Sequence, residues 1–166
     1  MKSVFATAIL AATVLGAQAQ DTRPAAPAAA RPACAAPQSP PKELVKKDLE
    51  TGTGRDIKFR SAVTVGYTGW LYDGCAKDLK GVKFDSSEGR NTPFGFMVGA
   101  GKVIKGWDEG LLGMKEKNAK RLLVIPPDKA YGEKGAPGVI PPNATLVFEV
   151  ETYAIVYQPT EEPEKK

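Results

Sequence analysis

Aromatic residues spaced among glycine and proline turns constrain the fold of this chain more than any other feature. Between residues 82 and 157 these aromatic residues include Phe84, Phe94, Phe96, Trp107, Tyr131 and Phe148. Each of these side chains carries a large apolar area, and the cluster has more aromatic surface than a small core usually needs. We therefore expect part of it to line a pocket.

Short runs of alternating apolar and polar residues predict β-strands. The expected strands cover residues 44–50, 62–70, 94–98, 119–125 and 146–151. In the second of these, Val63, Val65 and Tyr67 alternate with small or polar residues, so all three point to one face. Tyr67 is thus expected in the core or in a cavity within it. The polar stretch after the Asp73-Gly74 turn is interpreted as a loop that reaches Phe84.

One helix is predicted. Trp107, Leu111 and Met114 recur at helical spacing, and acidic residues at 108 and 109 suit the positive end of a helix dipole. Gly113 is expected to end this helix. The fold class is accordingly α+β, a twisted antiparallel sheet of about five strands with one short amphipathic helix across a face. Apolar residues expected simply to fill the core are Phe96, Leu111, Met114 and Leu146.

The composition excludes several classes of chemistry. Histidine is absent, so Ser-His and Cys-His nucleophiles, histidine zinc sites and imidazole bases are excluded, and a hydrolase using Ser86 or Ser87 would lack its base. The formal charge of +4 is too weak and dispersed to indicate nucleic-acid binding. We expect no cofactor and no metal.

The chain divides into four parts. Residues 1–19 have a signal-peptide pattern, with an apolar run shorter than the roughly 20 residues that span a bilayer. Residues 20–41 form an Ala/Pro-rich tether expected to be disordered, 42–158 a folded domain, and 159–166 a charged disordered tail. The tether has no room for a helical dimerisation segment, so a monomer is expected.

Export is expected from the signal-peptide pattern. The C-terminal sequence EEPEKK lacks a retention signal of the KDEL type, which favours a bacterial periplasm and leaves a eukaryotic secretory lumen open. Two cysteines in an exported chain suggest a disulfide between Cys34 and Cys75, with free thiols or an intermolecular bridge as alternatives.

Several motifs together carry a family resemblance. The runs YTGWLYDG, KFDSS, NTPFGFMVG, KVIKGWDEGLLGM, AYG and GVIPPNATLVFEVE occur in this order. They resemble the FKBP-type peptidyl-prolyl cis-trans isomerases over about residues 44–157. The resemblance implies an isomerase that assists the folding of exported proteins. Its implied ligands are proline-containing polypeptides and the macrolides tacrolimus and rapamycin. The alternative is a catalytically weak binding module or holdase chaperone of the same fold.

The resemblance also assigns roles to residues. It implies catalytic roles for Tyr67, Asp85, Trp107, Tyr131 and Phe148. Trp107 would be the pocket floor, with walls from Tyr67, Phe84, Phe94, Val103, Ile104 and Phe148. The backbone N–H of Ile104 and the hydroxyl of Tyr131 would be donors, and Asp85 a polar acceptor. Val139 and Ile140 would belong to an overhanging loop.

Two features depart from the family pattern, and two role assignments have simpler alternatives. Residues 75–83 expand the chain beside the pocket mouth, and Ala136 replaces a bulkier residue, which puts substrate preference in question. Asp85 could merely organise the Asp-Ser-Ser turn, and Tyr131 could merely anchor its loop.

Overall fold

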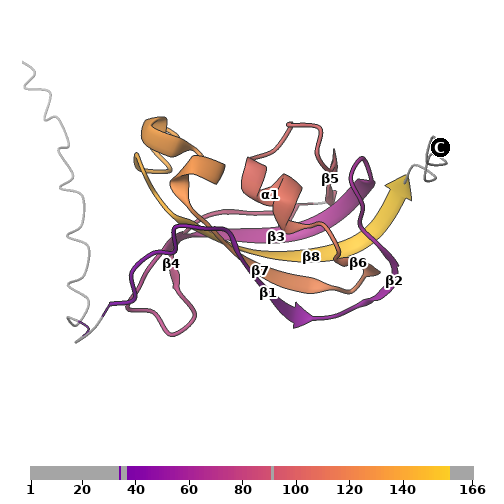
Figure 1. Cartoon of the computed structure of the whole chain (residues 1–166), viewed down its shortest axis with the longest axis horizontal. Helices are drawn as coiled ribbons and strands as arrows, with labels where there is room; N and C mark the ends of the chain where they lie inside the picture. The colour runs from indigo at the N-terminus through magenta and orange to yellow at the C-terminus, as the bar shows by residue number, and fades with distance from the viewer. Residues whose placement is uncertain (1–33, 35–36, 91, 158–166) are drawn as a thin grey trace, which may run out of the picture. The chain divides into compact units, whose positions relative to one another are not determined.

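The structure is an antiparallel sheet with one short helix over a single face (Figure 1). This computed structural model describes residues 34, 37–90 and 92–157. The strands are β1 (Val45–Glu50), β2 (Thr53–Asp56), β3 (Ala62–Tyr72), β4 (Lys80–Ser86), β5 (Phe94–Met97), β6 (Lys115–Lys117), β7 (Lys120–Ile125) and β8 (Leu146–Tyr157). The helical segments are α1 (Lys105–Gly110) and two 3₁₀ turns, η1 (Pro127–Lys129) and η2 (Gly132–Lys134).

The main sheet is built around β3. Its order is β1-β7-β8-β3-β4, and β5 also pairs with β3. Because β8 pairs along nearly the whole of β3, β5 and β4 share the other edge of that strand one after the other. Strands β2 and β6 form a separate two-stranded sheet.

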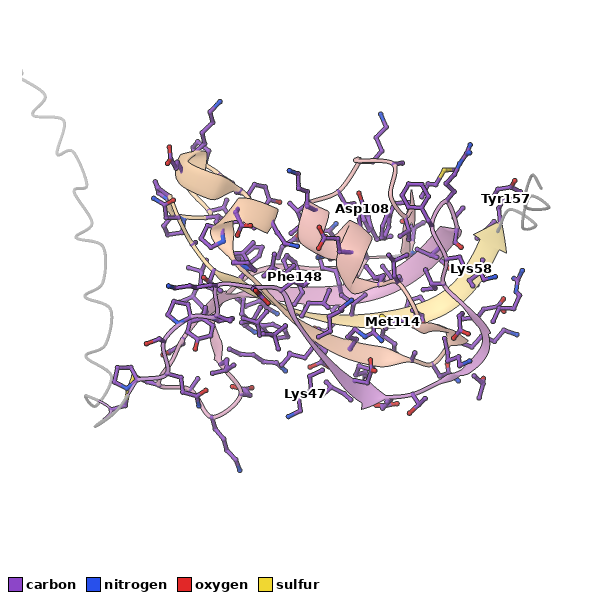
Figure 2. The ribbon with its side chains drawn as sticks, viewed as in Figure 1. Lys47, Lys58, Asp108, Met114, Phe148 and Tyr157 are labelled. Carbon is purple, nitrogen blue, oxygen red and sulfur yellow. A yellow bond between two sulfur atoms is a disulfide. The ribbon has the colours of Figure 1, made fainter. Side chains whose placement is uncertain are left out.

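One face of the sheet carries the core under α1. Val63, Val65 and Tyr67 are buried on this face, as the alternation in β3 predicted. Leu146 and Phe148 of β8 and Met114, which follows α1, belong to the same buried cluster; Phe148 and Met114 are labelled in the side-chain view (Figure 2). The predicted α+β class is confirmed. Among the other expected core residues, Leu111 and Met114 are fully buried, whereas Phe96 is half-buried against the core.

The sheet has more strands than the sequence predicted. The segment expected to be a loop up to Phe84 is a turn over residues 74–79 followed by β4. Strands β2 and β6 were also missed. All three carry exposed or half-buried polar residues, and the only apolar alternation among them, Val82 and Phe84 in β4, is too short for a strand to be recognised from it.

Helix α1 is shorter than predicted. It ends at Gly110 with Leu111 as its C-cap, so Met114 lies beyond the helix and Gly113 does not terminate it. Gly113 adopts a positive φ of 77° in the following turn. This turn is held by Ile57, which lies between β2 and β3. The N–H of Gly113 donates to the carbonyl of Ile57, and the N–H of Ile57 donates to the carbonyl of Met114. These tertiary bonds replace further helical ones.

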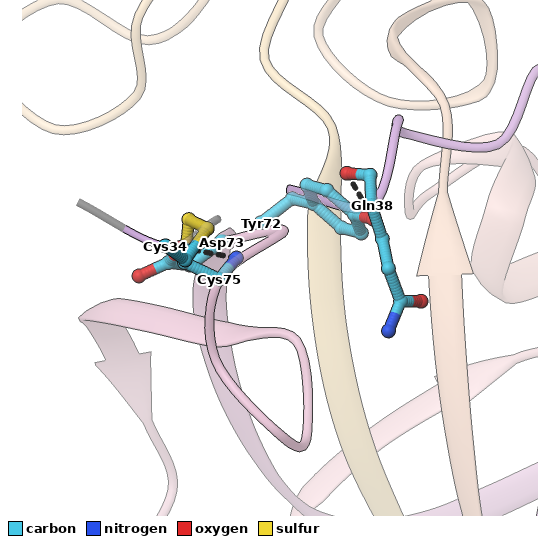
Figure 3. Close-up of a disulfide and its surroundings, with 5 residues drawn as sticks. All are labelled: Cys34, Gln38, Tyr72, Asp73 and Cys75. Atoms are coloured by element: carbon cyan, nitrogen blue, oxygen red, sulfur yellow. Dashed lines mark hydrogen bonds between the residues drawn. A yellow bond between two sulfur atoms is a disulfide. The ribbon is translucent and has the colours of Figure 1, made fainter. Parts of the chain in front are cut away.

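Ordered contacts begin before residue 42. Cys34 and Cys75 are joined by a disulfide, and the N–H of Gln38 donates to the carbonyl of Gly74 at 2.9 Å. The hydroxyl of Tyr72 donates to the carbonyl of Gln38 at 3.0 Å (Figure 3). The last residues of the predicted tether therefore pack on the β3–β4 turn; we call residues 37–41 the strap. The predicted signal peptide and tail, and most of the tether, lie outside the described residues.

Candidate functional site

A pocket of about 250 Å³ opens between α1, the core face of the sheet and two loops. Its lining is mainly aromatic and aliphatic. The lining residues are Tyr67, Phe84, Asp85, Phe94, Lys102, Val103, Ile104, Trp107, Tyr131 and Phe148. The structure thus brings together nine of the eleven site residues named from the sequence and adds Lys102.

Trp107 is enclosed by other aromatic rings, three of which line the pocket with it and a fourth of which, Phe96, lies 5.6 Å away. Its indole lies 5.1 Å from the ring of Tyr67, 5.9 Å from that of Phe94 and 5.3 Å from that of Phe148, in each case nearly perpendicular. Edge-to-face pairs of this kind are favourable, so the rings hold each other in fixed orientations. The result is a rigid aromatic wall rather than a collapsed core.

The indole N–H of Trp107 is buried and has no hydrogen-bond partner among the described residues. A buried donor without a partner costs stability and calls for an explanation. Trp107 is therefore poorly explained as a residue selected for stability alone, and its place in the pocket lining offers a functional reason.

Phe84 and Phe148 join the pocket wall because both rings pack directly against the backbone of β3. Gly69 of β3 lies beneath both rings, and a Cβ there would come within 2.7 Å of Phe148 and 2.8 Å of Phe84. The two rings meet perpendicularly with centroids 5.5 Å apart. Glycine at this position thus makes room for the pocket wall.

The polar side of the pocket centres on Asp85. Its carboxylate accepts a hydrogen bond from the hydroxyl of Tyr67 at 2.7 Å and pairs with Arg90 at 2.6 Å. Burial, followed by the hydrogen bond to Asp85, raises the pKa of Tyr67 to about 12. The phenol therefore stays protonated as a donor. The carboxylate of Asp85 also accepts a hydrogen bond from the backbone N–H of Ser86 at 2.8 Å, so Asp85 both shapes its turn and contacts Tyr67 and Arg90.

Two charged residues at the pocket were missed from the sequence. Arg90 follows Asp85 by five positions in an irregular loop, and Lys102 lies in the loop before α1. Neither residue is part of an apolar periodicity. The nearest sequence signal that could have pointed to Arg90 is the motif KFDSS, which ends three residues before it.

The loop before α1 is fixed by the helix itself. The side chain of Asp108 accepts the N–H of Gly99 at 2.7 Å and that of Gly101 at 3.2 Å. These bonds position the following segment, in which Val103 and Ile104 line the pocket. The N–H of Ile104 donates no hydrogen bond to another described residue.

Tyr131 forms the exposed rim, with 42% of its surface accessible. Its hydroxyl makes no hydrogen bond within the described part of the chain. The loop that carries it is ordered by backbone bonds, including Gly135 N–H to the Tyr131 carbonyl at 3.2 Å and Asn143 N–H to the Gly132 carbonyl at 2.9 Å. The hydroxyl is therefore available to a ligand and is not needed to anchor the loop.

Val139 and Ile140 do not line the pocket. A reciprocal pair of backbone hydrogen bonds between Ala136 and Ile140 turns this loop, and Ile140 becomes 5% exposed within the core. Val139 is 53% exposed. The side chain of Ile140, which the resemblance placed in an overhanging loop beside the pocket, is used for packing against the core.

A second hollow of about 490 Å³ adjoins the pocket. It shares Lys102, Val103, Ile104 and Tyr131 with the pocket and continues along Lys105 and Asp108. A ligand longer than one residue could extend into it.

The described residues contain no group of three or more acidic, cysteine or histidine side chains placed to hold a metal ion. Over the same ranges, no helix has the length and apolarity required to cross a membrane.

Comparison with known proteins gives a consistent family assignment. Residues 54–153 match the family model described as FKBP-type peptidyl-prolyl cis-trans isomerase. An FK506-binding protein of Neisseria meningitidis serogroup A is 51% identical over 108 residues, which cover 65% of this chain and 92% of that protein. Peptidyl-prolyl cis-trans isomerase Fkbp12 of Drosophila melanogaster is 53% identical over 89 residues, which cover 54% of this chain and 75% of that protein.

A solved structure has the same fold. The crystal structure of AtFKBP13 superposes with a TM-score of 0.57 at 34% sequence identity. The match covers 68% of this chain and 93% of the other.

Proposed function

Because this chain belongs to the FKBP-type peptidyl-prolyl cis-trans isomerase family, we propose that it rotates X-Pro bonds by holding the prolyl ring over Trp107. The chain is a peptidyl-prolyl cis-trans isomerase, and the proposal concerns how and where it acts. The observation that carries it is the aromatic pocket with a buried indole at its base.

An apolar pocket suits this reaction because of the electronic structure of the amide. Rotation about an X-Pro bond is slow, with a barrier of roughly 18–20 kcal/mol, because twisting removes resonance. The planar amide is more dipolar than the twisted one, so a water-poor site disfavours the ground state relative to the transition state. A thousandfold acceleration requires only about 4 kcal/mol.

No covalent or acid–base step is needed, and each side chain has a binding or orienting role. Trp107 would support the prolyl ring, with Phe148, Tyr67 and Phe94 around it. The free N–H of Ile104 would donate to a carbonyl of the peptide, as would the hydroxyl of Tyr131. Asp85, held by Tyr67 and Arg90, would present a fixed dipole beside the twisting amide.

The size of the pocket supports a single ring as its occupant. Its volume of about 250 Å³ is below the range of roughly 300–1,000 Å³ usual for sites that enclose drug-sized ligands. A macrolide such as tacrolimus or rapamycin would insert one ring and leave the rest outside. The adjoining hollow, with exposed Val139 farther along the same loop region, would receive neighbouring residues of an extended polypeptide.

We further propose that the protein acts as a monomer on exported proteins in a bacterial periplasm. The signal-peptide pattern of residues 1–19 and a disulfide between Cys34 and Cys75 support this, since disulfides persist in oxidising compartments. The domain would begin at Cys34, after a shorter tether than 20–41, and end near 158. Mass analysis of the protein from a periplasmic extract tests this, since a chain that retained residues 1–19 would contradict it.

The central experiment measures relaxation of a peptide with Leu or Phe before proline, with and without tacrolimus. We expect fast relaxation that tacrolimus blocks. Tyr131→Phe and Phe84→Ala should lower kcat/KM and weaken tacrolimus together. Tyr153→Phe, at an exposed tyrosine outside the pocket lining, serves as the control and should change neither.

The rival function, a holdase of the same fold, has a different outcome. Suppression of client aggregation without faster relaxation by the wild-type protein would support it and reject catalysis at this pocket. Normal isomerisation by both pocket variants would reject the site while leaving the family assignment intact.

A further inference from the structure

The C-terminal end of α1 is capped by the sheet. The helix has only six residues, and so short a helix is marginal without tertiary support. Arg121 of β7 donates through Nη1 to the carbonyl of Gly110 at 2.7 Å and to that of Leu112 at 3.0 Å. One guanidinium thus satisfies a carbonyl at the end of the helix and another in the turn that follows it.

Arg121 continues a row of side chains that faces α1. In β7, Arg121, Leu123 and Ile125 alternate onto the core face, opposite Val150, Phe148 and Leu146 of β8. Two glycines of α1 meet this row. A Cβ on Gly106 would overlap the side chain of Ile125, and one on Gly110 would lie 2.8 Å from Leu123. The helix therefore rests on β7 at the closest distance its backbone allows.

The guanidinium of Arg121 is itself held in place. Its side chain is 9% exposed, and Nε pairs at 2.5 Å with Asp48, the residue directly opposite on β1. A buried arginine needs its donors satisfied, and here the carboxylate fixes the fork that reaches the helix. The cation also lies at the negative end of the helix dipole.

Trp107 depends on this docking for its height above the sheet. It lies between Gly106 and Gly110 on α1, and its indole N–H has no hydrogen bond of its own. No polar contact on the ring can set its position. The position of the indole is therefore set by packing against neighbouring rings and by the position of the helix backbone.

We propose that Arg121 is a positioning residue that sets the depth of the Trp107 floor by fixing α1 against β7. The inference rests on the proposed function for its catalytic consequence. Arg121 touches no substrate, because it does not line the pocket. Its effect passes through the Gly110 carbonyl to the helix and then to the indole.

The test uses the full mature chain with Trp70→Phe, so that Trp107 is the remaining tryptophan. Arg121→Lys keeps the charge, but a single ammonium cannot reproduce the separate Nε and Nη1 bonds. Tacrolimus affinity, Trp107 emission and kcat/KM are measured well below the melting temperature. We expect tacrolimus to bind about tenfold more weakly, the order that a displacement of a fraction of an ångström produces, and the emission maximum to shift.

Two further variants separate positioning from stability. Asp48→Asn keeps both carbonyl bonds but loosens the fork, and should give a smaller change of the same kind. Lys47→Gln, on the face of the sheet away from α1, is the control and should change nothing (Figure 2). A lower melting temperature with unchanged affinity and emission in Arg121→Lys would overturn the proposal.

The proposed function can fail separately. A wild-type protein that does not accelerate X-Pro relaxation would contradict catalysis, while tacrolimus affinity and Trp107 emission would still test the position of the floor. Should tacrolimus not bind either, the emission shift alone decides the role of Arg121.

Discussion

Asp85 binds three donors at the edge of an apolar pocket, and this arrangement has a measurable pH signature. Its partner Tyr67 has a pKa raised to about 12 from 10.0 by burial and by the hydrogen bond to Asp85. A raised folded-state pKa stabilises the fold fully below the unfolded pKa, and that contribution is lost as pH rises through the folded pKa.

The first prediction follows for Tyr67→Phe. The difference in free energy of unfolding between wild type and variant should be constant from pH 8 to about 10 and shrink as pH approaches 12. Urea unfolding across this range measures it. A difference that stays constant up to pH 12 would mean that the phenol is not perturbed as described.

A second residue pair gives a prediction at acid pH. Arg55 donates to both carboxylate oxygens of Glu116 at 3.0 Å and lowers the pKa of Glu116 to about 2. A lowered pKa contributes stability that is present above the unfolded value and is lost as pH falls through the folded one. Glu116→Gln should therefore cost most above about pH 4.5, with the cost vanishing near pH 2.

Acid unfolding of wild type, Glu116→Gln and Arg55→Gln tests this pair. Both variants should lose the pH dependence that comes from the side-chain ion pair, and Arg55→Gln should cost further stability at every pH because it also removes the bond to the Ile155 carbonyl. If Glu116→Gln were equally destabilised at pH 6 and pH 2, the ion pair would not be the source of the effect.

Among the elements, α1 shows most clearly why a pattern and a structure differ. Periodicity placed Trp107 and Leu111 on the core face, and both are buried. It did not reveal that the helix stops at Gly110, since the bonds that compete with further turns come from Ile57, which is distant in sequence, and from Arg121 on the following strand β7. Strand β4 was missed for the complementary reason, because an exposed edge strand needs no apolar alternation.

The third prediction concerns the contact between α1 and β7. Gly106→Ala should lower stability by about 1–3 kcal/mol, the usual cost of overpacking, because its Cβ would overlap buried Ile125. It should also weaken tacrolimus binding by lifting Trp107. Gly95→Ala is the matched control, since the nearest atoms to its Cβ lie 3.8 Å away. Denaturant unfolding and inhibitor titration measure the two effects, and equal behaviour of both variants would refute close docking.

At the scale of the whole molecule, the disulfide and strap attach the N-terminal segment to the β3–β4 turn. The strap and this turn lie in close contact at Gly74, where a Cβ would overlap the carbonyl of Gln38. Neither cysteine lines the pocket. The covalent link should therefore affect stability rather than catalysis.

The fourth prediction tests that separation. Replacing both cysteines by serine should lower the free energy of unfolding by less than the roughly 4 kcal/mol expected for a cross-link of this loop length. The reason is that the segment which the cross-link holds in place is mainly the strap, which lies outside the sheet. The relaxation rate of X-Pro peptides should not change. A loss of kcat/KM in the folded double variant would connect the strap to the pocket.

The sequence by itself determined the α+β class and the core face of β3, and it named nine of the residues that the structure brings together in the pocket lining. The alternation of apolar and polar residues and the order of motifs are local properties of the chain, so they can be recognised from the sequence alone. Tertiary structure decided the rest: the end of α1, the strands β2, β4 and β6, the partners Arg90 and Lys102, and the burial of Ile140. Each depends on a contact between segments far apart in the chain or on packing in an irregular loop, which no local pattern records.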